Sequence, residues 1–241
     1  MVTPALSMSA ALRLALINRH LRALNPASVV EVGCGQGAMG YRLARQFDYE
    51  GYEPDEVSFA STHAHLTRLG RGKAVNAPLP ESPPQVFDML VAFEVLEHIE
   101  DDIGALALWA RWVPGGYIML SVPAHPERFG PWDRIVGHYR RYSRESLTTA
   151  FESAGLSVVS IEAWGMPIGY LSETVRNLCA GSREPSRDMN ADTAQSGRLL
   201  QPPAWLGRAV EWSMAPFALL QRPFRRSNFG TGYVALAAVP E

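Results

Sequence analysis

The chain of 241 residues is long enough for one large domain, or for one domain with an insertion. Hydrophobic residues make up 47% of it and its formal net charge is −2, so we expect a full core and no nucleic-acid partner. Two cysteines, Cys34 and Cys179, are too few for a disulfide framework or a zinc site. Because neither a signal peptide nor a membrane-spanning run is predicted, we expect a cytoplasmic protein.

Helices and short apolar strands alternate through most of the chain. The predicted helices span residues 9–24, 38–46, 56–69, 96–113 and 143–154. The predicted strands span residues 28–32, 48–53, 73–76, 87–93, 117–122, 156–163 and 232–239. This alternation predicts an α/β fold, with a seven-stranded, mostly parallel sheet and helices on both faces. In such a sheet the ligand lies beyond the carboxyl ends of the strands.

A helical insertion is predicted before the last strand, where the alternation stops. We interpret residues 165–227 as this insertion and residues 1–164 and 228–241 as the core. Within the insertion, the small and polar residues 181–198 are typical of a mobile loop. The apolar residues around that loop fit a lid over a binding site, a dimer interface or ordinary packing.

A glycine-rich turn follows the first predicted strand, in the tract VVEVGCGQGAMG that begins at Val29. Glycines let the backbone approach a ligand, and the helix that follows offers unpaired N–H groups. Glu31 sets the register E-x-G-x-G-x-G over Gly33, Gly35 and Gly37, which differs from the dinucleotide spacing G-x-G-x-x-G. The turn predicts a nucleotide-type cofactor.

Two later tracts extend this pattern. The tract FDMLVAFEVLEHIED begins at Phe87, and VPGGYIMLSVP begins at Val113. Together with the glycine turn, they resemble the class I S-adenosylmethionine-dependent methyltransferases of the small-molecule type over roughly residues 27–163. The resemblance implies a Rossmann-like fold, S-adenosylmethionine as cofactor and S-adenosylhomocysteine as its product.

The resemblance also implies a set of cofactor contacts. The glycine turn would hold the carboxylate of the cofactor, and Glu53, at the end of the second predicted strand, its ribose hydroxyls. Asn76 would accept from the adenine amino group, where that family often has an acid. The full set is Glu31, Gly33, Cys34, Gly35, Gly37, Glu53, Pro54, Asn76, Ala77, Phe93 and Glu94. For Cys34 the residue pattern favours a small packed residue, and for Glu53 the alternative is a solvated acid.

Three histidines that follow predicted strands are candidate bases for an acceptor that carries a proton. They are His98, His125 and His138. Each also has a structural interpretation, in a helix start, a loop cap or a solvated loop. HYRRYS tracts similar to the one at His138 occur in bacterial methyltransferases that resemble this chain, and its cations suit an anionic group. The candidate acceptor contacts are Tyr139, Arg140, Tyr142 and Trp164.

The sequence thus predicts methyl transfer by in-line displacement to an oxygen of a small molecule, glycan or lipid-linked metabolite. The alternatives are N-methylation and, in another class, an NAD-dependent oxidoreductase, against which the Gly33 spacing and the EVLEHI tract argue. No metal-ligand set is evident. Two further partner hypotheses are a homodimer through the insertion and a peripheral membrane contact by Arg222, Arg225 and Arg226.

Overall fold

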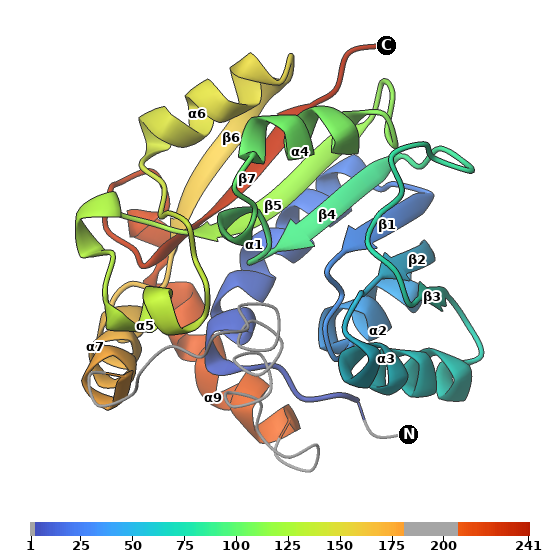
Figure 1. Cartoon of the computed structure of the whole chain (residues 1–241). Helices are drawn as coiled ribbons and strands as arrows, with labels where there is room; N and C mark the ends of the chain where they lie inside the picture. The colour runs from blue at the N-terminus through green and yellow to red at the C-terminus, as the bar shows by residue number, and fades with distance from the viewer. Residues whose placement is uncertain (1–2, 181–206) are drawn as a thin grey trace.

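A computed structural model describes residues 3–180 and 207–241 of the chain. Within these residues a single sheet of seven strands has the order β3-β2-β1-β4-β5-β7-β6 (Figure 1). The strands are β1 Ser28–Val32, β2 Asp48–Tyr52, β3 Lys73–Val75, β4 Met89–Phe93, β5 Tyr117–Pro123, β6 Ser157–Trp164 and β7 Gly232–Ala238. The first five strands run parallel, and β7 is antiparallel to both of its neighbours. The predicted Rossmann-like, mostly parallel sheet is confirmed.

Helices cover both faces of this sheet. The α-helices are α1 Met8–Leu24, α2 Ala38–Ala44, α3 Glu56–Leu69, α4 Asp102–Ala110, α5 Pro131–Ile135, α6 Arg144–Ser153, α7 Ile168–Ala180 and α9 Gly207–Leu220. Short 3-10 turns are η1 Leu96–His98, η2 Pro126–Arg128 and η4 Arg222–Phe224. Ser143 caps α6, since its hydroxyl accepts a hydrogen bond from the Ser146 amide at 3.1 Å.

Alternate residues of the central strands point to opposite faces of the sheet and pack into two separate cores. In β4, Leu90 belongs to the core that α4 and α6 cover, whereas Val91 belongs to the core that α1, α2 and α3 cover. Figure 1 shows α4 and α6 on one side of the sheet and α1 passing behind it. The sheet is therefore buried on both faces, as a parallel sheet normally is.

The predicted helix over residues 96–113 is wrong in one respect. The segment begins with the short turn η1, straightens, and starts again as α4, where Asp101 accepts a hydrogen bond from the Gly104 amide at 2.9 Å. An aspartate is a strong N-cap, so it starts a new helix within the apolar run. The break places Glu97 and His98 in a turn at the end of β4 rather than along a long helix.

Between β6 and β7 the described residues form α7, α9 and η4. Figure 1 shows α7 and α9 with α5 beyond the arrowheads of β4 and β5. The buried Gln221 joins this part to the core, because its amide donates to the Leu12 carbonyl at 2.6 Å and accepts from the Gly165 amide at 2.9 Å. The predicted mobile loop 181–198 lies outside the described residues. None of the described helices is long and apolar enough to cross a membrane.

Candidate active site

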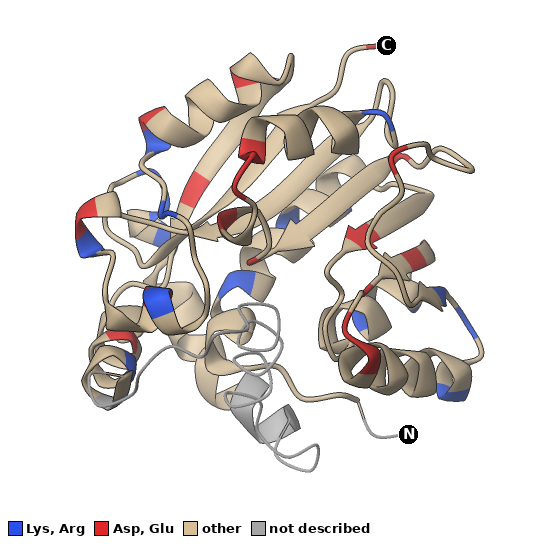
Figure 2. Cartoon of the chain, viewed as in Figure 1, with Lys and Arg blue, Asp and Glu red and all other residues tan. Residues whose placement is uncertain are grey.

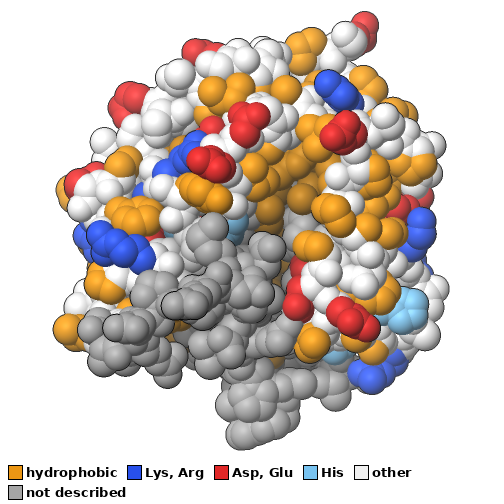
Figure 3. Space-filling view, in the orientation of Figure 1, with side chains coloured by type: hydrophobic (Ala, Val, Ile, Leu, Met, Phe, Trp, Pro, Cys, Tyr) orange, Lys and Arg blue, Asp and Glu red, His pale blue; other side chains and the backbone are white. Residues whose placement is uncertain are grey.

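A cavity of about 1450 Å³ lies beyond the carboxyl ends of the parallel strands. It is lined by residues of α1, the glycine turn, the ends of β2 and β4, the segment before α6, and α7. Figure 3 shows it as a hollow with largely hydrophobic walls. Pockets for one ligand usually measure 300–1,000 Å³, so this cavity has room for a cofactor and an acceptor together.

The glycine turn forms one end of the cavity, and its three glycines all have positive φ. The angles are +65° at Gly33, +53° at Gly35 and +77° at Gly37. A Cβ atom at Gly33 would lie 2.7 Å from Val95 Cγ2, and one at Gly37 would lie 2.7 Å from Thr62 Oγ1. A Cβ at Gly35 would meet nothing within 4 Å. Gly35 therefore turns its open side to the cavity and leaves space for a ligand against the backbone.

Glu53 ties the end of β2 to this turn. Its buried carboxylate accepts hydrogen bonds from the Gly35 amide at 2.8 Å and from the Asp55 amide at 2.9 Å. Glu53 and Pro54 line the cavity beside Gly35, where the sequence places the cofactor ribose. The carboxylate also fixes the conformation of the turn, which the spacing did not predict.

Asn76 and Ala77, predicted at the adenine, do not line the cavity. The side-chain amide nitrogen of Asn76 donates to the carbonyls of Glu53 and Pro54, at 2.9 and 3.2 Å, and so holds the backbone that follows β2. β3 ends at Val75, one residue earlier than predicted, and the cavity wall is continued by Pro78, Leu79 and Glu81.

Glu31 lies at the cavity wall with an unusual protonation equilibrium. Its carboxylate accepts a hydrogen bond from the Tyr49 hydroxyl at 2.6 Å. Burial raises the pKa of Glu31 to about 7, and the charge of Glu53 adds to this effect. Cys34 is buried beside it, and burial raises the pKa of its thiol, so the interpretation as a packed residue holds.

We expect the variant Glu31→Gln to change how stability depends on pH. The folded pKa of about 7 lies above the ordinary value of 4.5, so the stabilisation from Glu31 is complete below pH 4.5 and is lost as pH rises through 7. Relative to the wild type, the glutamine variant should gain on the order of 2–3 kcal/mol between pH 4.5 and 8. Urea unfolding of both proteins at these two pH values checks this, and a constant difference between them contradicts it.

Phe93, the last residue of β4, and Glu94, which follows it, both line the cavity, where the sequence predicts them at the cofactor. Glu94 has a φ of +59°, which is uncommon for a residue with a side chain and is typical of functional sites. Its carboxylate accepts from the Ser121 hydroxyl at 2.8 Å and pairs with Arg13 at 3.1 Å. The Arg13 guanidinium also lies 5.6 Å from the ring centre of Trp164, a predicted acceptor contact that lines the cavity. The sequence missed Arg13, although a cation among the apolar residues of α1 was a usable signal.

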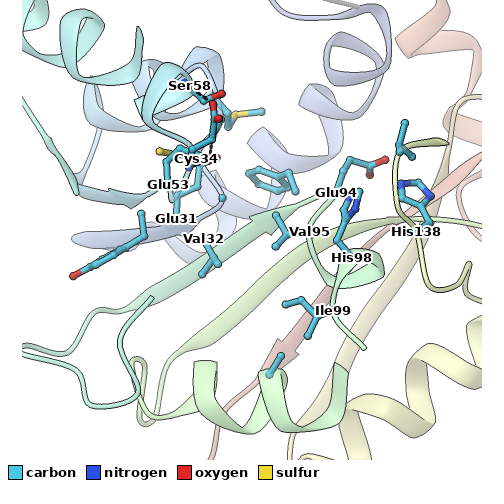
Figure 4. A pocket seen from close by; sticks show the side chains of 18 of the residues that line it. Glu31, Val32, Cys34, Glu53, Ser58, Glu94, Val95, His98, Ile99 and His138 are labelled. Carbon is cyan, nitrogen blue, oxygen red and sulfur yellow. Dashed lines mark hydrogen bonds between the residues drawn. The ribbon is translucent and has the colours of Figure 1, made fainter. Parts of the chain in front are cut away.

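Two of the three candidate histidines face the far end of the cavity. Figure 4 shows His98 and His138 beside Glu94, with Cys34 of the glycine turn and the neighbouring Glu31 and Glu53 at the opposite end. The rings of His98 and His138 meet edge to face, with their centres 4.6 Å apart. Burial lowers the pKa of His98 to about 3, and the neighbouring His138 lowers it further, so His98 is neutral near pH 7.

The prediction for His125 is wrong, because this residue is not part of the cavity wall. Its Nε2 lies 3.0 Å from the Gly230 carbonyl and its Nδ1 lies 3.3 Å from Glu127. His125 therefore joins the end of β5 to the start of β7.

The HYRRYS tract divides between the cavity and the rest of the molecule. His138 and Arg141 line the cavity, whereas Tyr139, Arg140 and Tyr142, the predicted acceptor contacts, do not. Tyr139 is 42% exposed. Arg140 and the buried Tyr142 both bind Asp102 in α4, at 2.7 and 2.8 Å. These three predictions are wrong, because the loop turns alternate side chains toward α4 and solvent.

Arg141 centres a buried network that the sequence did not predict. Its guanidinium donates to both carboxylate oxygens of Asp133, at 2.9 and 2.7 Å, and to Glu173 of α7. Asp133 also accepts from the Gly130 amide and lies 2.8 Å from His138 Nδ1. Burial alone would raise the pKa of Asp133, but the hydrogen bonds from His138 and Arg141 outweigh it and hold the pKa below its ordinary value.

Glu97 adds a third donor group next to the two histidines. Figure 2 shows acidic residues gathered along the chain between β4 and α4, the segment that includes Glu97. Glu97, His98 and His138 each offer one ligand atom, and these atoms all lie within 4.8 Å of one another. Burial raises the pKa of Glu97 well above its ordinary value, and the charge of Glu94 adds to this. A potential metal-ligand set therefore exists where none was evident in the sequence.

Comparisons with known proteins agree with this geometry. The family described as a methyltransferase domain matches residues 8–161. The ubiquinone biosynthesis O-methyltransferase of Aliivibrio fischeri is 27% identical over 116 residues, which cover 46% of this chain and 50% of that protein. The match thus spans about half the length of this relative.

Two solved structures share the fold. A coclaurine N-methyltransferase bound to N-methylheliamine and S-adenosylhomocysteine has a TM-score of 0.59 and 13% identity, covering 94% of this chain and 72% of that chain. A geranyl diphosphate C-methyltransferase from Streptomyces coelicolor has a TM-score of 0.58 and 13% identity, covering 94% and 78%. The chain therefore belongs to the methyltransferase-domain family and, within it, to the class I S-adenosylmethionine-dependent methyltransferases.

Proposed function

We propose that this protein transfers a methyl group from S-adenosylmethionine to an oxygen atom of a small molecule, glycan or lipid-linked metabolite. The observation that carries the proposal is the two-ended cavity. Gly35 and Glu53 define a cofactor end, and His98, His138 and Arg141 define a polar acceptor end. The similarity to a ubiquinone biosynthesis O-methyltransferase supports oxygen as the acceptor atom.

The residues of the cavity mainly have to bind and align the two reactants. S-adenosylmethionine supplies a methyl group on a positively charged sulfur, which is already a good leaving group. Alignment of an acceptor lone pair with such a bond lowers the barrier by several kcal/mol. Glu94 and Arg13 neutralise each other at 3.1 Å between the two ends, and Trp164 closes the wall beside them. These three side chains would hold the methyl group and the acceptor atom in line, in partly apolar surroundings.

Calorimetry with the purified chain tests the cofactor end. Saturable binding of S-adenosylhomocysteine with no binding of NAD is the expected result. Binding of NAD without binding of S-adenosylhomocysteine would contradict the proposed methyl transfer and favour an oxidoreductase. Incubation with S-adenosylmethionine and candidate acceptors, followed by mass spectrometry of the product, then separates O-methylation from N-methylation.

We expect Glu53→Gln to weaken S-adenosylhomocysteine binding about tenfold. The substitution removes a charged acceptor that holds the Gly35 amide at 2.8 Å and that faces the ribose position, and such bonds contribute about 1.5–3 kcal/mol. Glu50→Gln is the matched control, because Glu50 is a buried acid of β2, the strand that ends just before Glu53, and it binds the Tyr52 hydroxyl and does not line the cavity. Equal affinities of the two variants for S-adenosylhomocysteine would refute the role of Glu53.

A further inference from the structure

The buried carboxylate of Glu97 lacks the partners that such a group normally has. Glu97 is 0% exposed, and neither of its oxygens accepts a hydrogen bond from the described residues. His138 Nε2 lies 3.9 Å from Glu97 Oε1, which is too far for a hydrogen bond. Burying an unpartnered carboxylate is costly unless a proton, a water molecule or a cation satisfies it. The position therefore calls for an additional group.

The two imidazoles beside Glu97 are arranged as metal ligands usually are. The Asp133 carboxylate lies 2.8 Å from His138 Nδ1 and can only accept a hydrogen bond from it, so Nε2 is the ring nitrogen that faces Glu97. Carboxylates that hold the outer nitrogen of a metal-binding histidine are a recurring feature of metal sites. His98 likewise has a hydrogen bond to the Gly137 backbone. Both rings are thus oriented before any ion binds.

Distance and charge also suit an ion at this point. Two ligand atoms that each lie about 2.1 Å from one ion are about 3–4 Å apart. His138 Nε2 and Glu97 Oε1 are 3.9 Å apart, and the three ligand atoms lie within 4.8 Å of one another, so small side-chain movements bring all three to one ion. Two of the nearby cations are held in ion pairs, Arg141 with Asp133 and Glu173 and Arg13 with Glu94, and Arg176 of α7 also lines the cavity. One carboxylate with two imidazoles prefers a transition-metal ion to Mg²⁺ or Ca²⁺, which favour oxygen ligands.

We propose that Glu97, His98 and His138 bind one divalent transition-metal ion, such as Mn²⁺, Co²⁺ or Zn²⁺, at the acceptor end of the cavity. His98 and His138 line the cavity while Glu97 lies behind them, so the remaining coordination positions of the ion face the cavity. The role of the ion rests on the proposed function, because its open coordination positions would bind the oxygen atom of the methyl acceptor. In that arrangement His138 is a ligand and not a free base.

Metal titration of the full chain tests the site without any activity assay. After treatment with a chelator, we expect calorimetry to show one Co²⁺ or Mn²⁺ ion bound per chain, and bound Co²⁺ to give a visible absorption band. Glu97→Gln keeps the size of the side chain and removes the charged ligand, and His138→Ala removes an imidazole. Each should weaken Co²⁺ binding at least tenfold. His125→Asn is the control, since His125 lies outside the cavity and asparagine tolerates its φ of +68°.

The results distinguish the metal site from the proposed methyl transfer. Absence of saturable Co²⁺ binding, or equal affinity in the wild type, Glu97→Gln and His138→Ala, overturns the metal site. Binding of S-adenosylhomocysteine measured on the same samples reports on the cofactor end, and its failure would reject methyl transfer while leaving the metal result readable. Retained binding of S-adenosylhomocysteine by Glu97→Gln, with Co²⁺ binding weakened, supports the ion site and shows that this variant is folded.

Discussion

Arg141→Met should lower the free energy of unfolding by about 3–5 kcal/mol. Arg141 is the shared cation between two acids, and the side chains of Arg141, Asp133 and Glu173 are only 4%, 1% and 4% exposed. Without the guanidinium, the buried carboxylates of Asp133 and Glu173 lose the cation that they share, and only His138, the Gly130 amide and Arg128 remain as their partners. Urea unfolding followed by tryptophan fluorescence measures the loss.

Arg140→Met is the matched control for this loss. Arg140 is the neighbouring residue and also binds an acid, Asp102 at 2.7 Å, but its side chain is 32% exposed. An ion pair open to water contributes about 1 kcal/mol or less. If both variants lost the same small amount, the Asp133–Arg141–Glu173 network would not be a structural centre of the acceptor end.

This contrast between neighbouring arginines also marks the limit of the sequence analysis. The tract from His138 to Tyr142 has no helical or strand period, so nothing in it says which side chains share a face. Backbone hydrogen bonds decide the matter, because the Tyr139 amide donates to the Glu97 carbonyl and the Tyr142 amide to the Pro123 carbonyl. Those partners lie far away in the sequence, and the spacing alone therefore pointed to the wrong members of the cluster.

The cofactor end was more predictable because its signals are local. A glycine turn after an apolar strand and an acid at the end of the next strand follow from chain order alone, and the structure brings Gly35 and Glu53 within 2.8 Å. The possible metal ligands Glu97 and His98 were not recognised, because the mostly apolar sequence up to residue 113 suggested one continuous helix over residues 96–113. The signal that was overlooked is Asp101, whose capping of α4 separates Glu97 and His98 from that helix.

The second large effect is expected from Gly35→Val, which should weaken S-adenosylhomocysteine binding at least 100-fold, or by about 3 kcal/mol. A side chain at Gly35 meets no protein atom within 4 Å of its Cβ and extends into the cofactor end of the cavity. A φ of +53° also strains a β-branched residue, so some loss of stability accompanies the loss of binding. Calorimetry of the folded variant separates the two effects.

Gly155→Val supplies the control for backbone strain. Gly155 has a φ of +78°, is exposed after α6, and likewise has nothing within 4 Å of a Cβ, but it is not part of the cavity wall. It should lose similar stability and keep wild-type affinity for S-adenosylhomocysteine. Equal affinity in the two variants would mean that the cofactor does not lie against Gly35. Because Gly33 and Gly37 are required by contacts with Val95 and Thr62, Gly35 is the glycine of the turn whose missing side chain makes room for the ligand.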